Sequence, residues 1–258
     1  MITVNNLSKH FGGIKAVDGV DLHIDRGSIT GLVGPNGAGK TTMFNLIAGL
    51  YQPTEGEIIL DGEDVTELTS HQLFHKGLLR TFQIAHEFPT LSVLENLMMV
   101  PANQLGETLM NTWLKRRQIQ EEEKLLQEKA EEVIDFLSIS HLKNERAGNL
   151  SGGQKKLLEL ARTMMVDAKV VLLDEVGAGV NRTLLKQIGD AILRLNSERG
   201  YTFCMIEHDM DFISRLCNPV VVLAEGQILT TGTPDEIKSS DAVIEAYLGK
   251  GIKTEVAT

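Results

Sequence analysis

A glycine-rich turn at residues 34–42, Gly-Pro-Asn-Gly-Ala-Gly-Lys-Thr-Thr, constrains the fold of this chain more than any other feature. The turn follows the short apolar run GLVG at 31–34, which has the character of a strand. It leads into TTMFNLIAGL at 41–50, where apolar residues recur with helical spacing. A strand that passes through such a turn into a helix is the setting in which Gly-x-x-x-x-Gly-Lys-Thr predicts a phosphate-binding loop. We therefore expect an α/β core with a nucleotide site at this turn.

Each position of the turn has a chemical reason. Gly34, Gly37 and Gly39 let the backbone curl so that N–H groups point at phosphate oxygens, and the following helix adds its positive end. Lys40 can reach the β- and γ-phosphates, and the Thr41 hydroxyl is placed to ligate Mg²⁺. The alternative is a structural turn without a ligand, which the flanking strand and helix disfavour. The expected nucleotide-binding positions are Gly34, Pro35, Asn36, Gly37, Ala38, Gly39, Lys40, Thr41 and Thr42.

A second signal is the run VVLLDE at 170–175, an apolar strand that ends in two carboxylates. Open α/β sheets bind ligands at the carboxyl ends of their strands. Asp174 would hold Mg²⁺ through water, and Glu175 would polarise the water that attacks the γ-phosphate. Taken alone, Asp-Glu at the end of a strand is more often an ordinary strand terminus. Its pairing with the loop at 34–42 favours the catalytic interpretation.

Composition narrows the class of protein. The formal charge is −10, from 25 Lys and Arg against 35 Asp and Glu, which argues against a nucleic-acid-binding surface. Two cysteines, Cys204 and Cys217, are too few for a disulfide framework, so we expect a reducing compartment and inert packing thiols. No apolar run reaches the roughly 18–20 residues of a membrane helix, and the first residues lack the apolar centre of a signal peptide. We expect any membrane contact to be made through a partner.

Changes in apolar spacing and charge along the sequence predict subdomains. Residues 1–30 and GEIILDG at 56–62 have the alternation and turn residues of strands. Residues 92–146 are helical and strongly charged, and from 150 onward apolar runs alternate with helical segments, as in βα units around a mainly parallel sheet. The apolar stripe of the charged helix comprises Ile119, Leu125, Leu126, Ala130, Val133, Ile134 and Leu137. Its other face is expected to be solvated, with Lys124 and Glu128 paired at i, i+4.

With LSGGQ at 150–154, the ordered series of motifs from about residue 1 to 249 resembles the ATP-binding cassette (ABC) family. The resemblance implies a P-loop NTPase (RecA-like) α/β core with an antiparallel β subdomain and an α-helical subdomain. We expect one ABC ATPase domain over 1–258. Its approximate parts are the β subdomain at 1–30 and 56–70, the nucleotide-binding core at 31–55 and 150–258, and the helical subdomain at 84–149.

The LSGGQ segment opens a helix in this family and faces the γ-phosphate bound by the opposite subunit. The resemblance therefore implies that Ser151, Gly152, Gly153 and Gln154 form the second half of a composite site. A Ser hydroxyl, glycine N–H groups and a helix N-terminus do make an anion cradle. As a lone string LSGGQ could be a turn before a helix, and the order of the motifs disfavours that alternative.

The remaining positions follow from the resemblance. Phe11 resembles the aromatic that stacks on adenine, although a strand core residue is an equal alternative, and Val17 resembles the small apolar residue lining the base pocket. Gln83, in RTFQ, matches the glutamine that touches Mg²⁺ and the attacking water. His208, at the end of TFCMIEH, matches the switch histidine that contacts the γ-phosphate. The implied catalytic residues are thus Glu175, His208 and Gln83, and the implied Mg²⁺ ligands are Thr41, Gln83 and Asp174.

Two positions depart from the family pattern. The usual Pro after the catalytic carboxylate is Val176, and the Asp expected in the following loop is Asn181. Neither change removes a phosphate ligand. Other stretches resemble the branched-chain or hydrophobic amino-acid importer ATPases: RTFQIAHEFPTLSVLENL, an insertion with Trp113, and the ending AYLGKG. In that branch Phe88, Leu91 and Val93 would lie near the groove for a membrane subunit, and local core is the alternative for them.

The resemblance implies an ATP hydrolase that uses ATP and Mg²⁺ and powers an importer of branched-chain or other neutral amino acids. Two cassettes, identical or related, would sandwich two ATP molecules beneath transmembrane permease subunits, with a periplasmic binding protein as an indirect partner. The chain would then be peripheral, on the cytoplasmic face of the inner (plasma) membrane, without nucleic acid. The alternatives are the ATPase of a lipid or lipopolysaccharide exporter and a soluble ABC ATPase.

Overall fold

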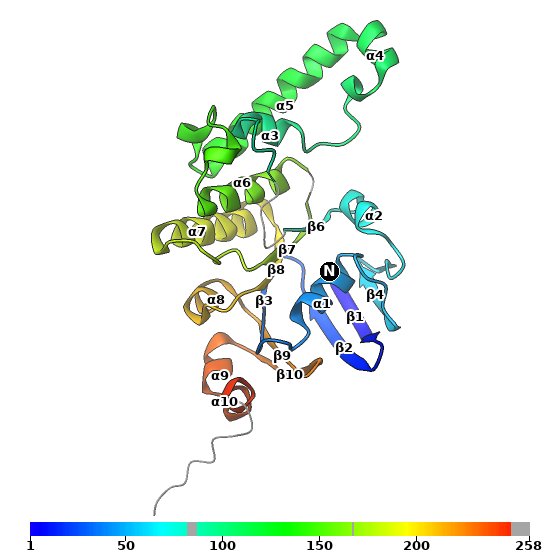
Figure 1. The fold of residues 1–258 in the computed structure, drawn as a ribbon, viewed down its shortest axis with the longest axis vertical. Helices are drawn as coiled ribbons and strands as arrows, with labels where there is room; N and C mark the ends of the chain where they lie inside the picture. The colour runs from blue at the N-terminus through cyan, green and yellow to red at the C-terminus, as the bar shows by residue number, and fades with distance from the viewer. Residues whose placement is uncertain (82–86, 167, 249–258) are drawn as a thin grey trace, which may run out of the picture. The chain divides into compact units, whose positions relative to one another are not determined.

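The computed structural model describes residues 1–81, 87–166 and 168–248 of the chain (Figure 1). The chain divides into two compact units, one made of Met1–Arg80, Lys169–Val176 and Ile192–Thr258, the other of Thr81–Ala168 and Gly177–Ala191. They are called unit 1 and unit 2 below, and each is described by itself. Within the described residues, no helix is both long enough and apolar enough to cross a bilayer.

Unit 1 begins with a four-stranded antiparallel sheet in the order β2-β1-β4-β5. Its strands are β1 (Ile2–Phe11), β2 (Ile14–Ile24), β4 (Glu55–Leu60) and β5 (Glu63–Asp64). In the second half of β2, buried Val20, Leu22 and Ile24 alternate with exposed residues, as in a sheet with one face on the core. The predicted antiparallel β part is therefore present in the fold.

A six-stranded sheet, in the order β10-β9-β3-β8-β7-β6, forms the rest of the unit 1 framework. It contains β3 (Ile29–Val33), β6 (Leu78–Arg80), β7 (Val170–Asp174), β8 (Thr202–Ile206), β9 (Val220–Ala224) and β10 (Gln227–Gly232). All neighbouring pairs are parallel except β10 with β9. Every residue of β3, β7 and β8 is buried, which explains their continuous apolar sequences.

The described residues of unit 1 include the helices α1 (Lys40–Ile47), α2 (Ser70–His75), α8 (Met210–Leu216), α9 (Pro234–Ser239) and α10 (Asp241–Leu248). The core joins α1 to both sheets, and Phe44 of α1 is fully buried there with Ile2, Leu32 and Leu172. Cys204 and Cys217 are free and buried, as expected of packing thiols.

Unit 2 is helical. It holds α3 (Val93–Met98), α4 (Leu109–Leu114), α5 (Arg116–Phe136) and α6 (Gly152–Met164), with short 3₁₀ turns at η1 (Leu105–Glu107), η2 (Ser140–Leu142) and η3 (Ala147–Asn149). Helix α7 (Arg182–Arg199) begins in unit 2 and ends in unit 1. The Lys124–Glu128 pair forms as predicted, at 3.7 Å between exposed side chains.

The apolar stripe expected on α5 is buried only in its second half. Ala130, Val133 and Ile134 are buried, whereas Leu125 is 66% exposed. The stripe is therefore fully covered by the chain only in the second half of the helix, because a helical apolar pattern does not itself supply a neighbour to pack against.

Candidate functional site

The turn at 34–42 links β3 to α1, and its first and third glycines are required by close backbone approach. Gly34 and Gly39 have φ angles of 150° and 101°. A Cβ at Gly34 would lie 2.0 Å from the Leu223 carbonyl oxygen, and one at Gly39 would lie 2.2 Å from the Ala16 carbonyl oxygen. Asn36, Gly37 and Thr41 are exposed. The turn therefore curls against β9 and β2 while leaving part of its backbone open to solvent.

Lys40 is folded into this turn. Its ammonium donates hydrogen bonds to the carbonyls of Gly34 at 2.7 Å and Pro35 at 3.0 Å, and its side chain is buried. Burial lowers the pKa of Lys40, and the carboxylates of Glu175 and Asp174 oppose that shift. The cation thus lies within electrostatic reach of both carboxylates, in a pocket of backbone that suits an anionic phosphate.

Asp174 ends β7, and Glu175 directly follows it. The Asp174 carboxylate accepts a hydrogen bond from the Arg80 guanidinium at 2.7 Å, and both side chains are buried. Glu175 has a φ of 49°, a left-handed backbone that is unusual for a residue other than glycine. Its N–H donates to the carbonyl of Ile206 at 2.9 Å, so the bend is anchored on β8. Such strained positions cluster at functional sites.

His208 lies just beyond the end of β8, the strand beside β7. Its Nε2 is 3.1 Å from Oε1 of Glu175. The parallel pairing of β7 and β8 explains the contact, because both strands end at the same edge of the sheet. Four predicted residues of unit 1, Lys40, Asp174, Glu175 and His208, therefore share one edge of the parallel sheet.

Phe11 is at the end of β1 and is 45% exposed, so it is not a core residue. Its ring contacts Tyr51 edge-on, with centroids 5.6 Å apart, and the Lys9 ammonium lies 5.4 Å from its centroid. Tyr51 was not singled out from the sequence, because a tyrosine in a loop carries no signal by itself. Val17 is fully buried in the core cluster, and its place beside a base stays a prediction.

In unit 2, Ser151 is the N-cap of α6. Its hydroxyl accepts from the Gln154 N–H at 3.4 Å, and the Gln154 side chain accepts from the Ser151 N–H at 2.8 Å, which makes a reciprocal capping box. A Cβ at Gly153 would lie 2.1 Å from Leu184 of α7, whereas one at Gly152 would meet no atom within 4 Å in the part of the chain that the structure describes. Packing inside the chain therefore explains the glycine at 153 but not the one at 152.

One of the two departures from the family pattern, Asn181, has a local explanation. Val176 is buried. Asn181 lies just before α7, and its side-chain oxygen accepts from the Leu184 N–H at 3.0 Å, which caps the helix as an aspartate would. Of the groove candidates, Val93 is fully buried, whereas Phe88 is 45% exposed with the Arg162 guanidinium 6.0 Å from its ring centroid. Gln83 lies outside the described residues.

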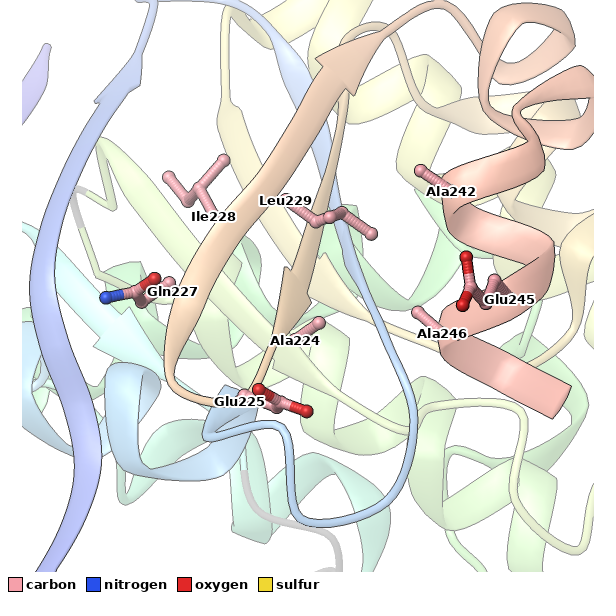
Figure 2. A pocket seen from close by; sticks show the side chains of 8 residues that line it. All are labelled: Ala224, Glu225, Gln227, Ile228, Leu229, Ala242, Glu245 and Ala246. Carbon is pink, nitrogen blue, oxygen red and sulfur yellow. The ribbon is translucent and has the colours of Figure 1, made fainter. Parts of the chain in front are cut away.

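Two further residues near the site were missed in the sequence. Arg80, in RTFQ, bonds both Asp174 and Asn45 of α1, and a charged residue closing an apolar strand was its signal. Tyr247 of α10 accepts a hydrogen bond from the Gly34 backbone N–H, and burial raises the pKa of its phenol. Residues Glu245 and Ala246, which precede Tyr247 on α10, line a hollow of about 330 Å³, and Glu225, Ile228 and Leu229 of the β9–β10 hairpin line its other side (Figure 2).

Known proteins share this arrangement. The family model described as "ABC transporter" matches residues 17–178, and the model described as "Branched-chain amino acid ATP-binding cassette transporter" matches residues 227–253. The "Probable branched-chain amino acid transport ATP-binding protein LivG" of Archaeoglobus fulgidus is 39% identical over 249 residues, which cover 96% of this chain and 95% of the relative. BraF of Pseudomonas aeruginosa, named a high-affinity branched-chain amino acid transport ATP-binding protein, is 36% identical and covers 97% and 98%.

Solved structures agree with the sequence relatives. A nucleotide-free ATP-binding cassette from an ABC transporter superposes with a TM-score of 0.83 at 36% identity, over 97% of this chain and 99% of that one. The ADP conformation of an ATP-binding cassette of an ABC transporter gives 0.82 at 35% identity, with the same coverage.

The phosphate loop and the α/β core define a P-loop NTPase that binds nucleotide. The chain belongs to the ABC transporter family, as its ATP-binding cassette. ATP hydrolysis coupled to transport is the activity of this family, so the predicted fold class, family and ATPase activity are confirmed.

Proposed function

We propose that this chain hydrolyses ATP to power the import of branched-chain amino acids through a membrane transporter. The observation that carries the proposal is similarity over almost the whole length to relatives named for branched-chain amino acid transport, at 36–39% identity. The match at 227–253 supports the same branch. Neither of these relatives is named for lipid export or for a soluble ATPase function.

ATP would be held by the turn at 34–42 through its backbone N–H groups and the Lys40 ammonium. That ammonium now bonds two carbonyls of the turn itself, so phosphate oxygens can exchange with those partners at little cost. Phe11 would stack on adenine, and its exposed ring with Tyr51 at its edge supports this role. Mg²⁺, bound by Thr41 with Asp174 and Gln83, would neutralise phosphate charge. The carboxylate and hydroxyl oxygens of Asp174 and Thr41 are ligands that Mg²⁺ prefers.

Hydrolysis would depend on Glu175 and His208. Glu175 would orient a water and accept its proton as the water oxygen bonds to the γ-phosphorus and the bond to the β-phosphate oxygen breaks, leaving ADP and phosphate. The left-handed backbone at Glu175 and the contact with His208 Nε2 fix the direction of the carboxylate. His208 would contact the γ-phosphate and hold Glu175 in place.

One chain would supply half of each composite site. Residues 151–154 of a second cassette, of the same or a related chain, would close on the γ-phosphate. The open space over Gly152 supports this arrangement, because no atom of the described residues lies within 4 Å of a Cβ at this position. The expected partners are this second cassette, transmembrane permease subunits and, indirectly, a periplasmic binding protein. The chain would lie at the cytoplasmic face of the inner membrane. The subdomain boundaries given from the sequence stay a prediction.

The test is transport by the reconstituted complex. The chain is copurified with its membrane subunits and reconstituted in proteoliposomes. ATP is enclosed in the lumen, on the side of the cassettes, and radiolabelled leucine and the binding protein are added to the outside buffer. ATP-dependent leucine accumulation is expected, with a charged amino acid as the control substrate. Export of leucine, or ATPase activity that no branched-chain amino acid stimulates, would contradict the proposal.

A further inference from the structure

Helix α4 exposes its apolar side chains. Trp113 is 90% exposed, Leu109 88%, Leu114 76% and Met110 69%, and we call these four side chains the Trp113 face. Few other large apolar side chains of the described residues are as exposed. An isolated exposed leucine is normal for a globular protein, but four such residues on one helix make a contiguous apolar patch that marks an interaction surface.

The polarity of α4 is the reverse of an ordinary surface helix. The helix packs against η1 and the start of α5, at one end of unit 2 (Figure 1). Its half-buried residues are the polar Asn111 and Thr112, and the Thr112 hydroxyl donates to the Leu109 carbonyl at 2.6 Å. A helix that stabilised only its own unit would turn its apolar side inward. We therefore expect the exposed apolar side of α4 to contact an apolar environment that is not part of this chain.

Three basic residues follow α4 directly in the sequence. Lys115, Arg116 and Arg117 are all exposed, in a chain whose formal charge is −10. Arg117 pairs with Glu121 at 3.1 Å. Among the described residues, Lys115 and Arg116 have no ion pair within 4.0 Å.

The acidic side chains of this region do not lie directly beside Lys115 and Arg116 in the sequence. Glu107 is on η1, Glu122 accepts the Leu105 N–H at 2.8 Å, and Glu121 and Glu123 lie at least one helical turn beyond Lys115 on α5. The cations nearest the Trp113 face are therefore the adjacent Lys115 and Arg116.

We propose that the Trp113 face inserts into the headgroup boundary of an anionic lipid bilayer, with Lys115 and Arg116 on the lipid phosphates. Tryptophan, leucine and methionine beside a short basic cluster are the composition of helices that lie in a membrane interface. A protein partner would suit the apolar residues equally, but the basic cluster in an acidic chain favours an anionic surface. The contact adds to anchoring through membrane subunits, which is the route expected from the sequence. It rests on the proposed function only for the presence of a membrane nearby.

One helix of this size binds lipid weakly. Its effect would come from local concentration, because a cassette already held by membrane subunits meets the bilayer as an intramolecular partner. The lipid contact would then restrict how unit 2 approaches the membrane.

Trp113 is the single tryptophan of the chain, so the tryptophan fluorescence of the free chain reports on this surface alone. For the assembled complex, the spectrum of the same complex with Trp113→Phe is subtracted. The full chain is titrated with vesicles of phosphatidylglycerol and phosphatidylcholine, and separately with phosphatidylcholine alone. We expect a blue shift and quenching by brominated lipid with the anionic vesicles, with binding reversed at about 0.5 M salt, where the Debye length falls to about 4 Å. Pure phosphatidylcholine should leave the emission unchanged or shift it far less.

Variants separate the charge and apolar contributions. The double variant Lys115→Gln, Arg116→Gln should weaken partition into anionic vesicles roughly tenfold or more. The double variant Leu109→Ser, Leu114→Ser should also lose binding. Lys124→Gln, at an exposed lysine of α5, and Ile14→Ser, at a 70% exposed residue of β2, are the matched controls and should bind as the parent does. Circular dichroism and basal ATP hydrolysis check that all variants fold.

Three outcomes would overturn the proposal. The first is that Trp113 emission changes neither when the free chain is mixed with saturating anionic vesicles nor when the complex is placed in anionic nanodiscs. The second is a shift that appears on assembly with membrane subunits in detergent and does not change when lipid is added, which assigns the surface to a protein partner. The third is a concentration-dependent shift without vesicles, which assigns it to a second copy of the chain.

Discussion

The Arg80 guanidinium lies 2.7 Å from the Asp174 carboxylate, and both side chains are buried. Arg80 ends β6 and Asp174 ends β7, and the parallel register of these strands brings the two side chains to the same edge of the sheet. Arg80 also donates to Asn45 of α1. One cation thus joins the helix that begins at the phosphate loop to the carboxylate expected to hold Mg²⁺.

Replacing Arg80 with methionine should destabilise the chain. The variant keeps a long side chain but leaves Asp174 buried without this cation, and breaking one partner of a buried pair costs about 3–5 kcal/mol. Urea unfolding of the parent and variant measures the difference. The matched control is Arg26→Met, which breaks the more exposed Arg26–Asp61 pair at 2.7 Å and should cost no more than about 1 kcal/mol. Equal losses in the two variants would show that burial of the Arg80 pair has no special cost.

Glu175→Gln should bind ATP but hydrolyse it about 10²- to 10⁴-fold more slowly, because the amide keeps the shape of the side chain and loses the proton acceptor. Steady-state phosphate release measures hydrolysis, and a filter assay measures ATP binding. In the presence of ATP the variant should also elute as a closed dimer in size exclusion. Near-normal turnover would remove Glu175 from the role of base.

The sequence predicts those parts of the site that consist of contiguous residues. The turn at 34–42 and the strand ending in Asp174 and Glu175 each carry their own pattern, because the local backbone and the chemistry coincide. Arg80 and Asp174 are 94 positions apart in the sequence, and their contact depends on the pairing of β6 with β7. No local pattern encodes the register of that pairing. Tyr51 and Tyr247 were missed for the same reason, since each acts on a distant segment.

The outward apolar face of α4 escaped prediction on different grounds. A helical apolar pattern indicates that one face is covered, but not whether the cover is the same chain or something outside it. Trp113 was noted only as part of an insertion. The exposed first half of α5 illustrates the same ambiguity, since Leu125 follows the apolar spacing and is nevertheless in solvent.

The adjacent glycines of the LSGGQ segment should respond differently to alanine. Gly153→Ala forces a Cβ against Leu184 and should cost about 1–3 kcal/mol of unfolding free energy. Gly152→Ala has open space and should change stability by no more than about 0.5 kcal/mol. If Gly152 faces the nucleotide of a second cassette, the ATPase activity of the assembled transporter should still fall in that variant. Normal activity and normal stability of Gly152→Ala would contradict the composite site.

Phe11→Ala should weaken ATP and GTP binding by about 5- to 100-fold, the equivalent of losing one stacked base. The fold should be unaffected, because the ring is 45% exposed and outside the core. Equilibrium titration with a fluorescent nucleotide measures the change. Ile14→Ala, at an exposed apolar residue of the neighbouring strand, is the control for general effects on this sheet. Unchanged affinity in Phe11→Ala would mean that the base lies elsewhere.

The buried thiols should make the chain less stable at alkaline pH. Burial raises the pKa of Cys204 from 9.0 to about 12, and burial also raises the pKa of Cys217, with Cys204 and Glu207 adding to the shift. An acid whose pKa is raised on folding keeps its full stabilising contribution below the unfolded pKa. Between about pH 9 and 12 the unfolded thiol loses its proton while the folded thiol keeps it, so stability falls as the pH rises.

For Cys204 alone the slope should be about −1.4 kcal/mol per pH unit in that window. Urea unfolding from pH 8 to 11 measures the slope, and Cys204→Ala should make it shallower by this amount even though the alanine lowers stability at every pH. Val221→Ala, at a buried residue of β9, leaves a comparable cavity without a titrating group. Its slope should match that of the parent, because lysines and tyrosines that also titrate there are the same in both. A slope unchanged by Cys204→Ala would mean that the thiol ionises as readily in the folded chain as in the unfolded one.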